Sequence, residues 1–294
     1  MHEMIMMMNR RRSGIKREWA VAVVGAGGEM ESLEAGKQEI MRRTRVAARD
    51  LRRMLSSSSR TTIAGRECAI VINLEHIKCI ITANEALFLN SRDPSLVSLL
   101  HHLHNRIILP SSSSTNILPF EFVALEACLH ASCTTLENLS NILQQEAHTA
   151  FYKLTSEINI LNLERVRQIK NRLLALTCRA HKVRDELERL LDNDENMIEM
   201  YLTNKLRSED AVSNVEELEM LLGAYLVQIG GTLNKLFTMN EGEGVCGRNR
   251  GVHKGDAEGE TGQAAANGSE SGHGKCHCGG LHYRRGYFYH QHSH

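Results

Sequence analysis

The sequence predicts an α+β fold, with a small α/β subdomain followed by a bundle of long helices and a disordered tail. Residues 63–89 are rich in β-branched side chains, which favour strands. Beyond Pro119, the last of 3 prolines, apolar side chains recur every three or four positions, as they do in helices. An aromatic content of 4% and so few prolines do not suit an all-β sandwich or barrel, which needs many strands and turns.

Composition divides the chain into four segments. Residues 1–41 show no clear apolar period, and we expect a disordered or targeting extension there. Residues 42–116 are expected to form the α/β subdomain, and residues 117–239 the long-helix bundle with the start of a stalk helix. Residues 240–294 are rich in glycine and histidine and nearly free of aliphatic side chains. Such a tail cannot bury enough apolar surface to offset the entropy of ordering.

Three strands and one helix are expected in the α/β subdomain. Residues 68–73 and 77–82 are almost continuously apolar, and a shorter run follows at residues 86–89. Strands of this kind are typical of a sheet that is covered on both faces. A helix then begins at Asp93-Pro94, because proline fits the first turn of a helix, and it continues to Ile107.

Three histidines lie close together on this helix, at His101, His102 and His104. Only His101 and His104 share a helix face, since neighbouring residues point about 100° apart. No acidic residue is near them in the sequence. We therefore expect them to face solvent rather than to bind a metal ion.

Three long helices are expected after the subdomain. In residues 122–143 and 215–236 the apolar side chains step by three and four, and residues 166–190 hold this rhythm without a break. Each segment exceeds the usual length of about 10–14 residues. Gly223, Gly230 and Gly231 should weaken the last helix, by roughly 1 kcal/mol each relative to alanine. Long helices with narrow apolar seams favour a bundle or stalk over a compact enzyme core.

No stretch of the sequence is suited to crossing a membrane. A bilayer-spanning helix needs roughly 20 predominantly apolar residues. The longest charge-free stretch before the tail runs from Met220 to Asn234 and contains three glycines and a glutamine. Read alone, the sequence therefore predicts a soluble chain.

The sequence contains no recognisable catalytic constellation. It lacks Gly-x-Ser-x-Gly, His-Glu-x-x-His and a phosphate-cradling glycine loop before a helix. The 35 basic and 35 acidic side chains balance, which argues against binding nucleic acid through a global positive field. We therefore expect neither an enzyme with a small-molecule substrate nor a nucleic-acid-binding protein.

The segment from Arg42 to Arg53 is strongly basic, in contrast to the balanced whole. It lacks interleaved aromatic side chains, on which bases of a nucleic acid would stack. We expect either a solvated helix face or an intramolecular match to the acidic cluster at residues 192–199.

An acidic cluster near the end of the second long helix is the candidate metal site. Its carboxylates are those of Asp192, Asp194, Glu195 and Glu199. Carboxylates are the ligands that hard divalent cations prefer, but an EF-hand is excluded, since Met197 replaces the required glycine and Thr203 the closing glutamate. Two alternatives remain, a loose patch that binds partly hydrated Mg²⁺ weakly and a solvated helix end. Acidic side chains at a helix C-terminus oppose its dipole, which favours a further reason for their presence.

Five long runs of the sequence carry a family resemblance. They are RTRVAARDLRRM (43–54), GRECAIVINLEHIKCIITANEALFLN (65–90), LPFEFVALEACL (118–129), LNLERVRQIKNRLLALTCRAHKVRDELERLLDNDENMIEMYLT (161–203) and VEELEMLLGAYLVQIGGTLNKL (215–236). Together, and in this order, they resemble the magnesium transporters of the CorA superfamily, and most closely the branch found in plants and mitochondria.

The resemblance implies both a fold and a function. In that family an N-terminal α/β domain and a long-helix bundle form a soluble funnel, whose last helix continues into the first of two membrane helices. Five subunits surround one pore, and a Gly-Met-Asn tripeptide at the pore mouth selects hydrated Mg²⁺. The funnel senses Mg²⁺ and closes the pore when the ion is plentiful. The resemblance thus implies Mg²⁺ as a weakly bound regulatory cofactor, a pentamer, and an organellar or endomembrane location.

The sequence departs from the family pattern after Leu236, where it turns toward the glycine- and histidine-rich tail. The remainder of the stalk, both membrane helices and the Gly-Met-Asn motif do not appear, and Met239-Asn240, which follows a threonine, is not accepted as a remnant. We therefore expect a truncated chain, the Mg²⁺-sensing domain without pore helices, that does not transport Mg²⁺ alone.

Two alternatives to this interpretation stay open. In the first, the chain is a non-transporting interaction subunit that co-assembles with full-length relatives. In the second, it is the product of gene decay or of an incorrect gene model. The oligomer is expected to be a homo-oligomer or a hetero-oligomer with full-length relatives. If the chain is the Mg²⁺-sensing domain, the acidic cluster at residues 192–199 is the candidate sensing site.

Overall fold

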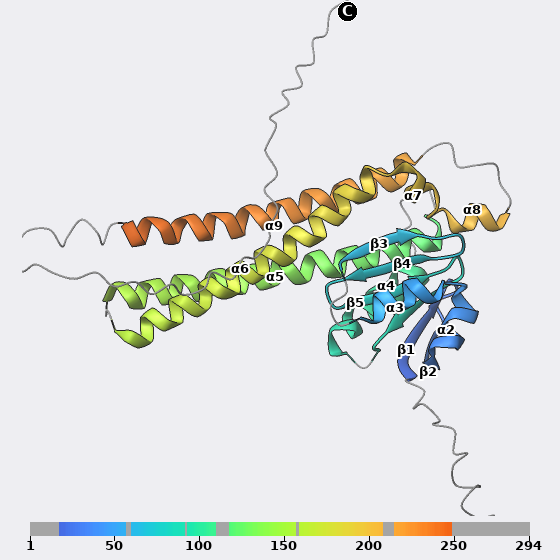
Figure 1. Cartoon of the computed structure of the whole chain (residues 1–294), viewed down its shortest axis with the longest axis horizontal. Coiled ribbons are helices and arrows are strands. Elements are labelled where there is room, and N and C mark those ends of the chain that lie inside the picture. The colour runs from blue at the N-terminus through green and yellow to red at the C-terminus, as the bar shows by residue number, and fades with distance from the viewer. Residues whose placement is uncertain are drawn as a thin grey trace, which may run out of the picture. The chain divides into compact units, whose positions relative to one another are not determined.

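A six-stranded antiparallel sheet lies at one end of a bundle of long helices (Figure 1). The structure is a computed structural model, and it describes residues 18–56, 60–91, 93–109, 118–156, 159–207 and 215–248. The sheet comes first in the chain and the long helices follow it. The predicted α+β fold class is therefore confirmed.

The sheet has the strand order β2-β1-β6-β5-β4-β3. Its strands are β1 (Glu18–Gly25), β2 (Met30–Gly36), β3 (Thr62–Gly65), β4 (Ile70–Leu74), β5 (Ile77–Ile81) and β6 (Glu85–Leu89). A hairpin of β1 and β2 is joined to a meander of β3 to β6, because β6 returns to pair with β1 and places Leu87 opposite Val23. The three predicted strands correspond to β4, β5 and β6, with bounds that differ by no more than two residues.

The prediction of an irregular extension up to residue 41 is wrong from Glu18 onward. Strands β1 and β2 occupy this region, and helix α2 (Lys37–Thr44) follows them directly. The apolar side chains of β1 from Val21 to Val24 are buried. Strand β2 was not predicted from the sequence because it is an edge strand with mostly exposed and often acidic side chains. Its apolar residues therefore do not recur at a regular spacing. Residues 1–17 lie outside the described part.

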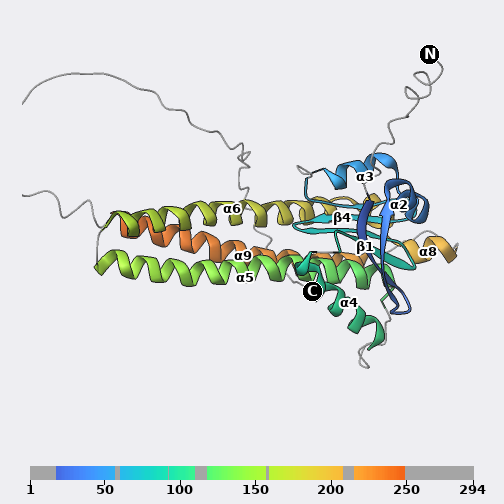
Figure 2. The same cartoon turned by 90° about the horizontal axis from the view of Figure 1, so that it is seen from below.

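Helices cover both faces of the sheet, as predicted. Helices α2 and α3 (Ala48–Leu55) cover one face, which we call the outer face, and α4 (Pro94–Ile108) and α5 (Phe120–Ser156) cover the other, the bundle face (Figure 2). Alternate side chains of β4 serve the two cores, since Ile70 and Ile72 point to the bundle face and Val71 to the outer face.

Three long helices form the bundle. They are α5, α6 (Ile160–Leu191) and α9 (Glu216–Arg248), and the short helices α7 (Asp194–Ile198) and α8 (Leu202–Arg207) lie between α6 and α9 in the chain. Helix α6 runs back along α5, and α9 packs against both. The predicted seam of α6 is buried from Ile169 to Leu190. The bundle-face core thus continues from the sheet along the three helices.

Helix α9 corrects the boundary that we placed at residue 240. It is continuous across Gly223, Gly230 and Gly231 and continues to Arg248, so residues 240–248 belong to the helix. No proline interrupts this stretch, and each added residue of an existing helix gains a backbone hydrogen bond. The remaining tail, residues 249–294, lies outside the described residues. Among those described, no helix combines the length and the apolar character that crossing a membrane requires.

The histidines of α4 face solvent only in part. His101 is exposed, as expected. His102 stacks on His130 of α5 with ring centroids 5.0 Å apart, and His104 Nδ1 lies 2.9 Å from the carbonyl oxygen of Gly28. The prediction is wrong for His102 and His104, because α4 packs against α5 and the β1–β2 turn comes close to it.

Candidate functional site

The four predicted carboxylates lie at the corner where α6 ends and α7 begins. Asp192 is the residue that ends α6, Asp194 and Glu195 form the first turn of α7, and Glu199 ends α7. All four side chains are exposed to solvent. The structure therefore places them on one short stretch of surface, which we call the acidic corner.

Two asparagines fix the backbone of the acidic corner. Asn193 caps α7, since its side-chain oxygen accepts a hydrogen bond of 2.8 Å from the backbone N–H of Asn196. Asn196 in turn accepts a hydrogen bond of 2.7 Å from the backbone N–H of Gly65 in β3. The approach is so close that a Cβ atom at Gly65 would lie 2.6 Å from the carbonyl oxygen of Asn196. Only glycine allows α7 to dock on the sheet in this way.

The last turns of α6 hold the free edge of the sheet. Glu186 Oε1 accepts a hydrogen bond of 2.6 Å from the N–H of Ile63, and Arg189 donates one of 2.9 Å to the carbonyl oxygen of Ile63. Arg189 also donates to Glu186, whose side chain is only 4% exposed. Because β3 is an edge strand, these side chains satisfy backbone groups that would otherwise lack a partner.

Sequence reasoning missed this role of Glu186, Arg189 and Asn196. A glutamate and an arginine three positions apart on a helix normally indicate a local ion pair on the surface. The only signal in the sequence was that Glu186 falls next to the apolar seam of α6 rather than opposite to it. The partner strand β3 had not been predicted, so nothing indicated what Glu186 would bind.

The charges of the acidic corner are only partly compensated. Lys205 of α8 forms an ion pair with Glu199 and donates a hydrogen bond of 3.0 Å to its carbonyl oxygen. Asp194 and Glu195 lie at the start of α7, where negative charge is favourable. Asp194 and Glu195 therefore do not oppose a helix dipole, contrary to the prediction, because a new helix, capped by Asn193, begins at Asp194.

The acidic corner has no closed cage for a metal ion. In the part of the chain that the structure describes, no three His, Cys, Asp or Glu side chains come together as a group that could hold one. Exposed single carboxylates suit an ion that keeps most of its water shell, as Mg²⁺ does. Binding of Mg²⁺ by Asp192, Asp194, Glu195 and Glu199 stays a prediction.

The basic segment from Arg42 to Arg53 has partners other than the acidic corner. Arg43 forms a bidentate ion pair with Glu85 of β6 at 2.6 Å. Arg42 pairs with Glu39 on its own helix, and Arg53 lies 4.0 Å from Asp50. The alternative of a match to the acidic cluster is therefore wrong for these three arginines. The segment is also not one helix face, because Arg45, with φ 55°, separates α2 from α3.

Comparison with known proteins extends over most of this structure. A family model described as "Magnesium transporter MRS2-like" matches residues 22–241, which include the sheet except the first four residues of β1, and most of the bundle. The match begins within β1, which independently supports the view that the folded part starts well before residue 42.

Three plant proteins illustrate the similarity. "Magnesium transporter MRS2-B" from Oryza sativa subsp. indica is 38% identical, over 79% of this chain and 66% of its own length. "Magnesium transporter MRS2-10" from Arabidopsis thaliana is 36% identical, over 80% of this chain and 70% of its own length. "Magnesium transporter MRS2-E" from Oryza sativa subsp. indica is 37% identical, over 79% and 72% respectively. The chain thus spans about two thirds of the length of these relatives.

Proposed function

The chain belongs to the MRS2-like family of magnesium transporters, and from this we propose that its sheet and helical bundle form the Mg²⁺-responsive part of such a transporter. The observation that carries the proposal is the acidic corner, where four exposed carboxylates lie within eight residues on a backbone tied to the sheet. Mg²⁺ is the ion that the names of the relatives specify, and carboxylates are its preferred protein ligands.

The proposed response begins with weak binding of a hydrated Mg²⁺ ion. The ion would contact Asp192, Asp194 and Glu195 mostly through its water molecules, and it would compete with Lys205 for Glu199. Binding would lower the repulsion between neighbouring carboxylates of the corner. Because Asn196 and Glu186 join this corner to β3, a change in its geometry would act directly on the edge of the sheet.

Calorimetric titration with millimolar Mg²⁺ tests this proposal. Asp192→Ala/Asp194→Ala should bind Mg²⁺ more weakly than the unaltered chain. Asp185→Ala/Glu188→Ala is the matched control, because it also removes two exposed carboxylates from the same end of α6, where both pair with Arg184. Equal titrations of the unaltered chain and of the Asp192/Asp194 variant would contradict a sensing role for the acidic corner.

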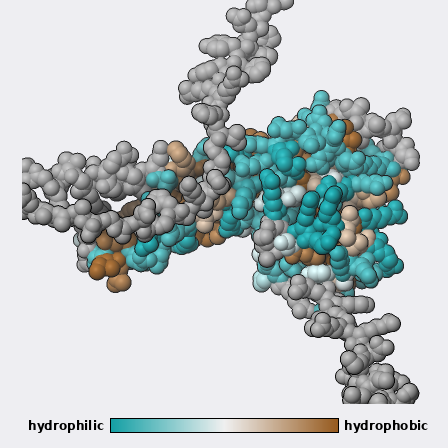
Figure 3. Space-filling view, in the orientation of Figure 1, coloured by the Kyte–Doolittle hydropathy of each residue, from teal (hydrophilic) through white to brown (hydrophobic). Residues whose placement is uncertain are grey.

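We also propose that the chain assembles with copies of itself or with full-length relatives, as a pentamer. Helix α9 supports this proposal, because it carries no charge between Glu219 and Lys235 and exposes Met220 and Val227 to 70% and 77%. Ile160 and Leu161, where α6 begins, are exposed apolar side chains as well. A hydrophobic patch is visible at the far end of the bundle (Figure 3). Uncharged helix faces of this kind suit contact with another helix.

Light scattering coupled to size-exclusion chromatography measures the assembly. Val227→Glu should reduce the oligomer mass of the chain or its mixture with a full-length relative. Leu174→Glu serves as the control, since Leu174 is a similarly exposed apolar residue, on α6. A chain that stays monomeric, alone and with the relative, would contradict assembly and would favour the alternative of gene decay.

For the complete transporter we propose Mg²⁺ as the transported ion and an organellar or endomembrane location, in line with the names of the relatives. No enzymatic activity is proposed. The expectation that residues 1–294 alone do not transport Mg²⁺ is tested by expression in a host that lacks magnesium uptake. Restored growth on low Mg²⁺ would overturn this expectation, and a reduced flux through a coexpressed relative would favour the interaction-subunit alternative.

A further inference from the structure

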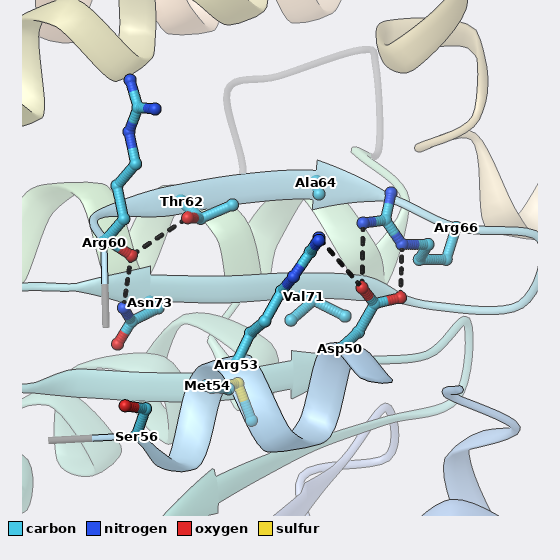
Figure 4. A pocket seen from close by; sticks show the side chains of 10 residues that line it. All are labelled: Asp50, Arg53, Met54, Ser56, Arg60, Thr62, Ala64, Arg66, Val71 and Asn73. Carbon is cyan, nitrogen blue, oxygen red and sulfur yellow. Dashed lines mark hydrogen bonds and ion pairs between the residues drawn. The ribbon is translucent and has the colours of Figure 1, made fainter. Parts of the chain in front are cut away.

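A cavity opens on the outer face of the sheet, beside helix α3 and over strands β3 and β4 (Figure 4). Its volume is about 490 Å³. Two cross-strand pairs contribute to its lining, Thr62 with Asn73 and Ala64 with Val71. The cavity exists because α3 ends at Leu55 and because Thr62 and Ala64 are too small to fill the space beside it. It is separate from the acidic corner, where α7 contacts the end of β3.

A buried carboxylate organises the positive charge around this cavity. The side chain of Asp50 is only 5% exposed, and Arg66 clamps it with hydrogen bonds of 2.8 and 3.3 Å. The hydrogen bond from Arg66, together with the positive charges of Arg66, Arg49 and Arg53, holds the pKa of Asp50 below its ordinary value. Among the lining residues, the carboxylate of Asp50 thus faces two arginine side chains, Arg66 and Arg53, which leaves an excess of one positive charge at the cavity.

Arg66 and Arg53 differ in how many hydrogen bonds their guanidinium groups donate to the protein. Arg66 is committed to the protein, since it donates to Asp50 and to the carbonyl oxygen of Gly65. Arg53 points toward Asp50 in Figure 4, but its nearest nitrogen is 4.0 Å from the carboxylate, beyond hydrogen-bond distance. Its side chain is 70% exposed, and its guanidinium makes no hydrogen bond among the described residues. Arg53 therefore presents a planar group of donors at the cavity.

Arg60 contributes its backbone rather than its charge. Its carbonyl oxygen accepts hydrogen bonds of 3.0 Å from Thr62 and 2.7 Å from Asn73, which closes one end of the lining. Figure 4 shows its side chain directed away from Asp50. The other walls carry Met54 and Val71, so the cavity has an apolar part next to the guanidinium of Arg53.

We propose that this cavity binds a small organic phosphate ester, with Arg53 as its main ligand. A phosphate monoester carries about −1.5 to −2 charges near neutral pH, so the local excess of positive charge attracts it. Its oxygens fit the planar fork of a guanidinium better than they fit a point charge. A volume of about 490 Å³ exceeds what a phosphate group fills and lies in the range of ligand cavities, so Met54 and Val71 would contact the organic part.

Calorimetric titration of the full chain with phenyl phosphate, at fixed ionic strength, tests this proposal. Saturable binding is expected, and Arg53→Ala should weaken it about tenfold or more, because hydrogen bonds between charged groups are lost. Arg52→Ala is the matched control, since Arg52 is an exposed arginine one position away on the same helix. Arg66 is left unchanged because its loss would leave the buried Asp50 without its clamp.

A second variant distinguishes the effect of the cavity volume on binding from the effect of the charges around it. Ala64→Leu keeps every charge but fills the cavity, and it should also abolish binding; thermal unfolding of each variant checks that the fold is intact. Titration with inorganic phosphate, and sedimentation with vesicles that contain phosphatidic acid, distinguish an organic phosphate from a free ion or a lipid headgroup.

Three outcomes would overturn the proposal. The first is equal weakening by Arg52→Ala and Arg53→Ala, which would indicate general attraction of anions. The second is unchanged binding in a folded Ala64→Leu variant. The third is binding of the vesicles, or of inorganic phosphate, without binding of phenyl phosphate. The Mg²⁺ titration of the acidic corner is independent of all three.

Discussion

The two faces of the sheet are buried to very different extents. The bundle face joins a core that continues through α4 and α5 along the whole helical bundle, with fully buried side chains such as Phe88 and Leu125. The outer face has a small core under two short helices, around Ile40 and Leu51. The strands between them are the same, so the difference comes from what packs on each face.

Because of this difference, the bundle face mainly stabilises the fold, whereas the outer face is accessible to a ligand. The bundle face is covered by α5, a helix of 37 residues, and its side chains are buried in one core with the helices. The outer face is covered by helices of 8 residues each, which leave the cavity beside α3 and the arginines around Asp50 open to solvent. The edge of the sheet at β3 is covered to an intermediate extent, since side chains of α6 and α7, Glu186 and Asn196, bind its backbone.

The largest effect is expected for Leu125→Ala on the bundle face. Leu125 is fully buried, and α5 is held in place by the sheet, α4, α6 and α9, so the cavity left behind cannot collapse. The variant should lose roughly 4–5 kcal/mol of unfolding free energy. Urea unfolding followed by circular dichroism measures the loss. A value below that of the corresponding outer-face variant would contradict the comparison of the two faces.

Leu51→Ala on the outer face is the matched test, since Leu51 is equally buried. Helix α3 is short and can move into the space that the leucine leaves, so the expected loss is roughly 2–3 kcal/mol. Hydrogen exchange should show faster exchange in α2 and α3, while α5 and α6 stay protected. Equal exchange throughout the chain would show that both faces unfold as one unit.

A smaller effect is expected from pH at the contact of α4 with α5. Burial, and then the positive charges of His130 and Arg106, lower the pKa of His102, while the nearby Glu126 acts in the opposite direction. A histidine with a lowered pKa favours folding in its neutral form. This contribution is therefore present above the unfolded-state value of about 6.5 and is lost as the pH falls through the lower folded-state value.

Thermal unfolding between pH 7.5 and 5 measures this contribution. His102→Asn should flatten the fall in melting temperature toward acidic pH. His101→Asn is the control, because His101 is exposed on the same helix. The same slope in both variants would mean that the pH dependence arises elsewhere in the chain.

The smallest change in unfolding free energy is expected in α9, far from both faces of the sheet, and it should be a gain rather than a loss. Gly231→Ala in α9 should stabilise the chain by about 0.5–1 kcal/mol, because a Cβ at Gly231 meets no atom within 4 Å and alanine favours helix. Gly28→Ala is the contrast, since Gly28 has φ +89° and its Cβ would lie 2.9 Å from Ile108. That variant should be destabilised, and chemical unfolding compares the two. A destabilised Gly231→Ala would indicate that this part of α9 is packed against a further copy.

The sequence by itself determined the elements that are marked by their apolar side chains. Strands β4 to β6 were predicted from short, almost continuous apolar runs. The helix after Asp93 and the seam of α6 were predicted because their apolar side chains recur at the spacing of a helix. The family was also recognised from sequence, and comparison with known proteins confirmed it. The acidic corner was located as a cluster, since its carboxylates are close in the chain.

Only the tertiary structure decided what the polar residues do. No regular spacing of apolar residues indicates strand β2, with its acidic side chains. The same is true of the hydrogen bonds that Glu186 and Arg189 form with Ile63, and of the hydrogen bond between Asn196 and Gly65. The arginines around Asp50 likewise come together only because α3 packs beside β3 and β4. Burial of an apolar side chain depends mainly on its own pattern, whereas a polar side chain acquires its role from a partner that the fold brings from elsewhere in the chain.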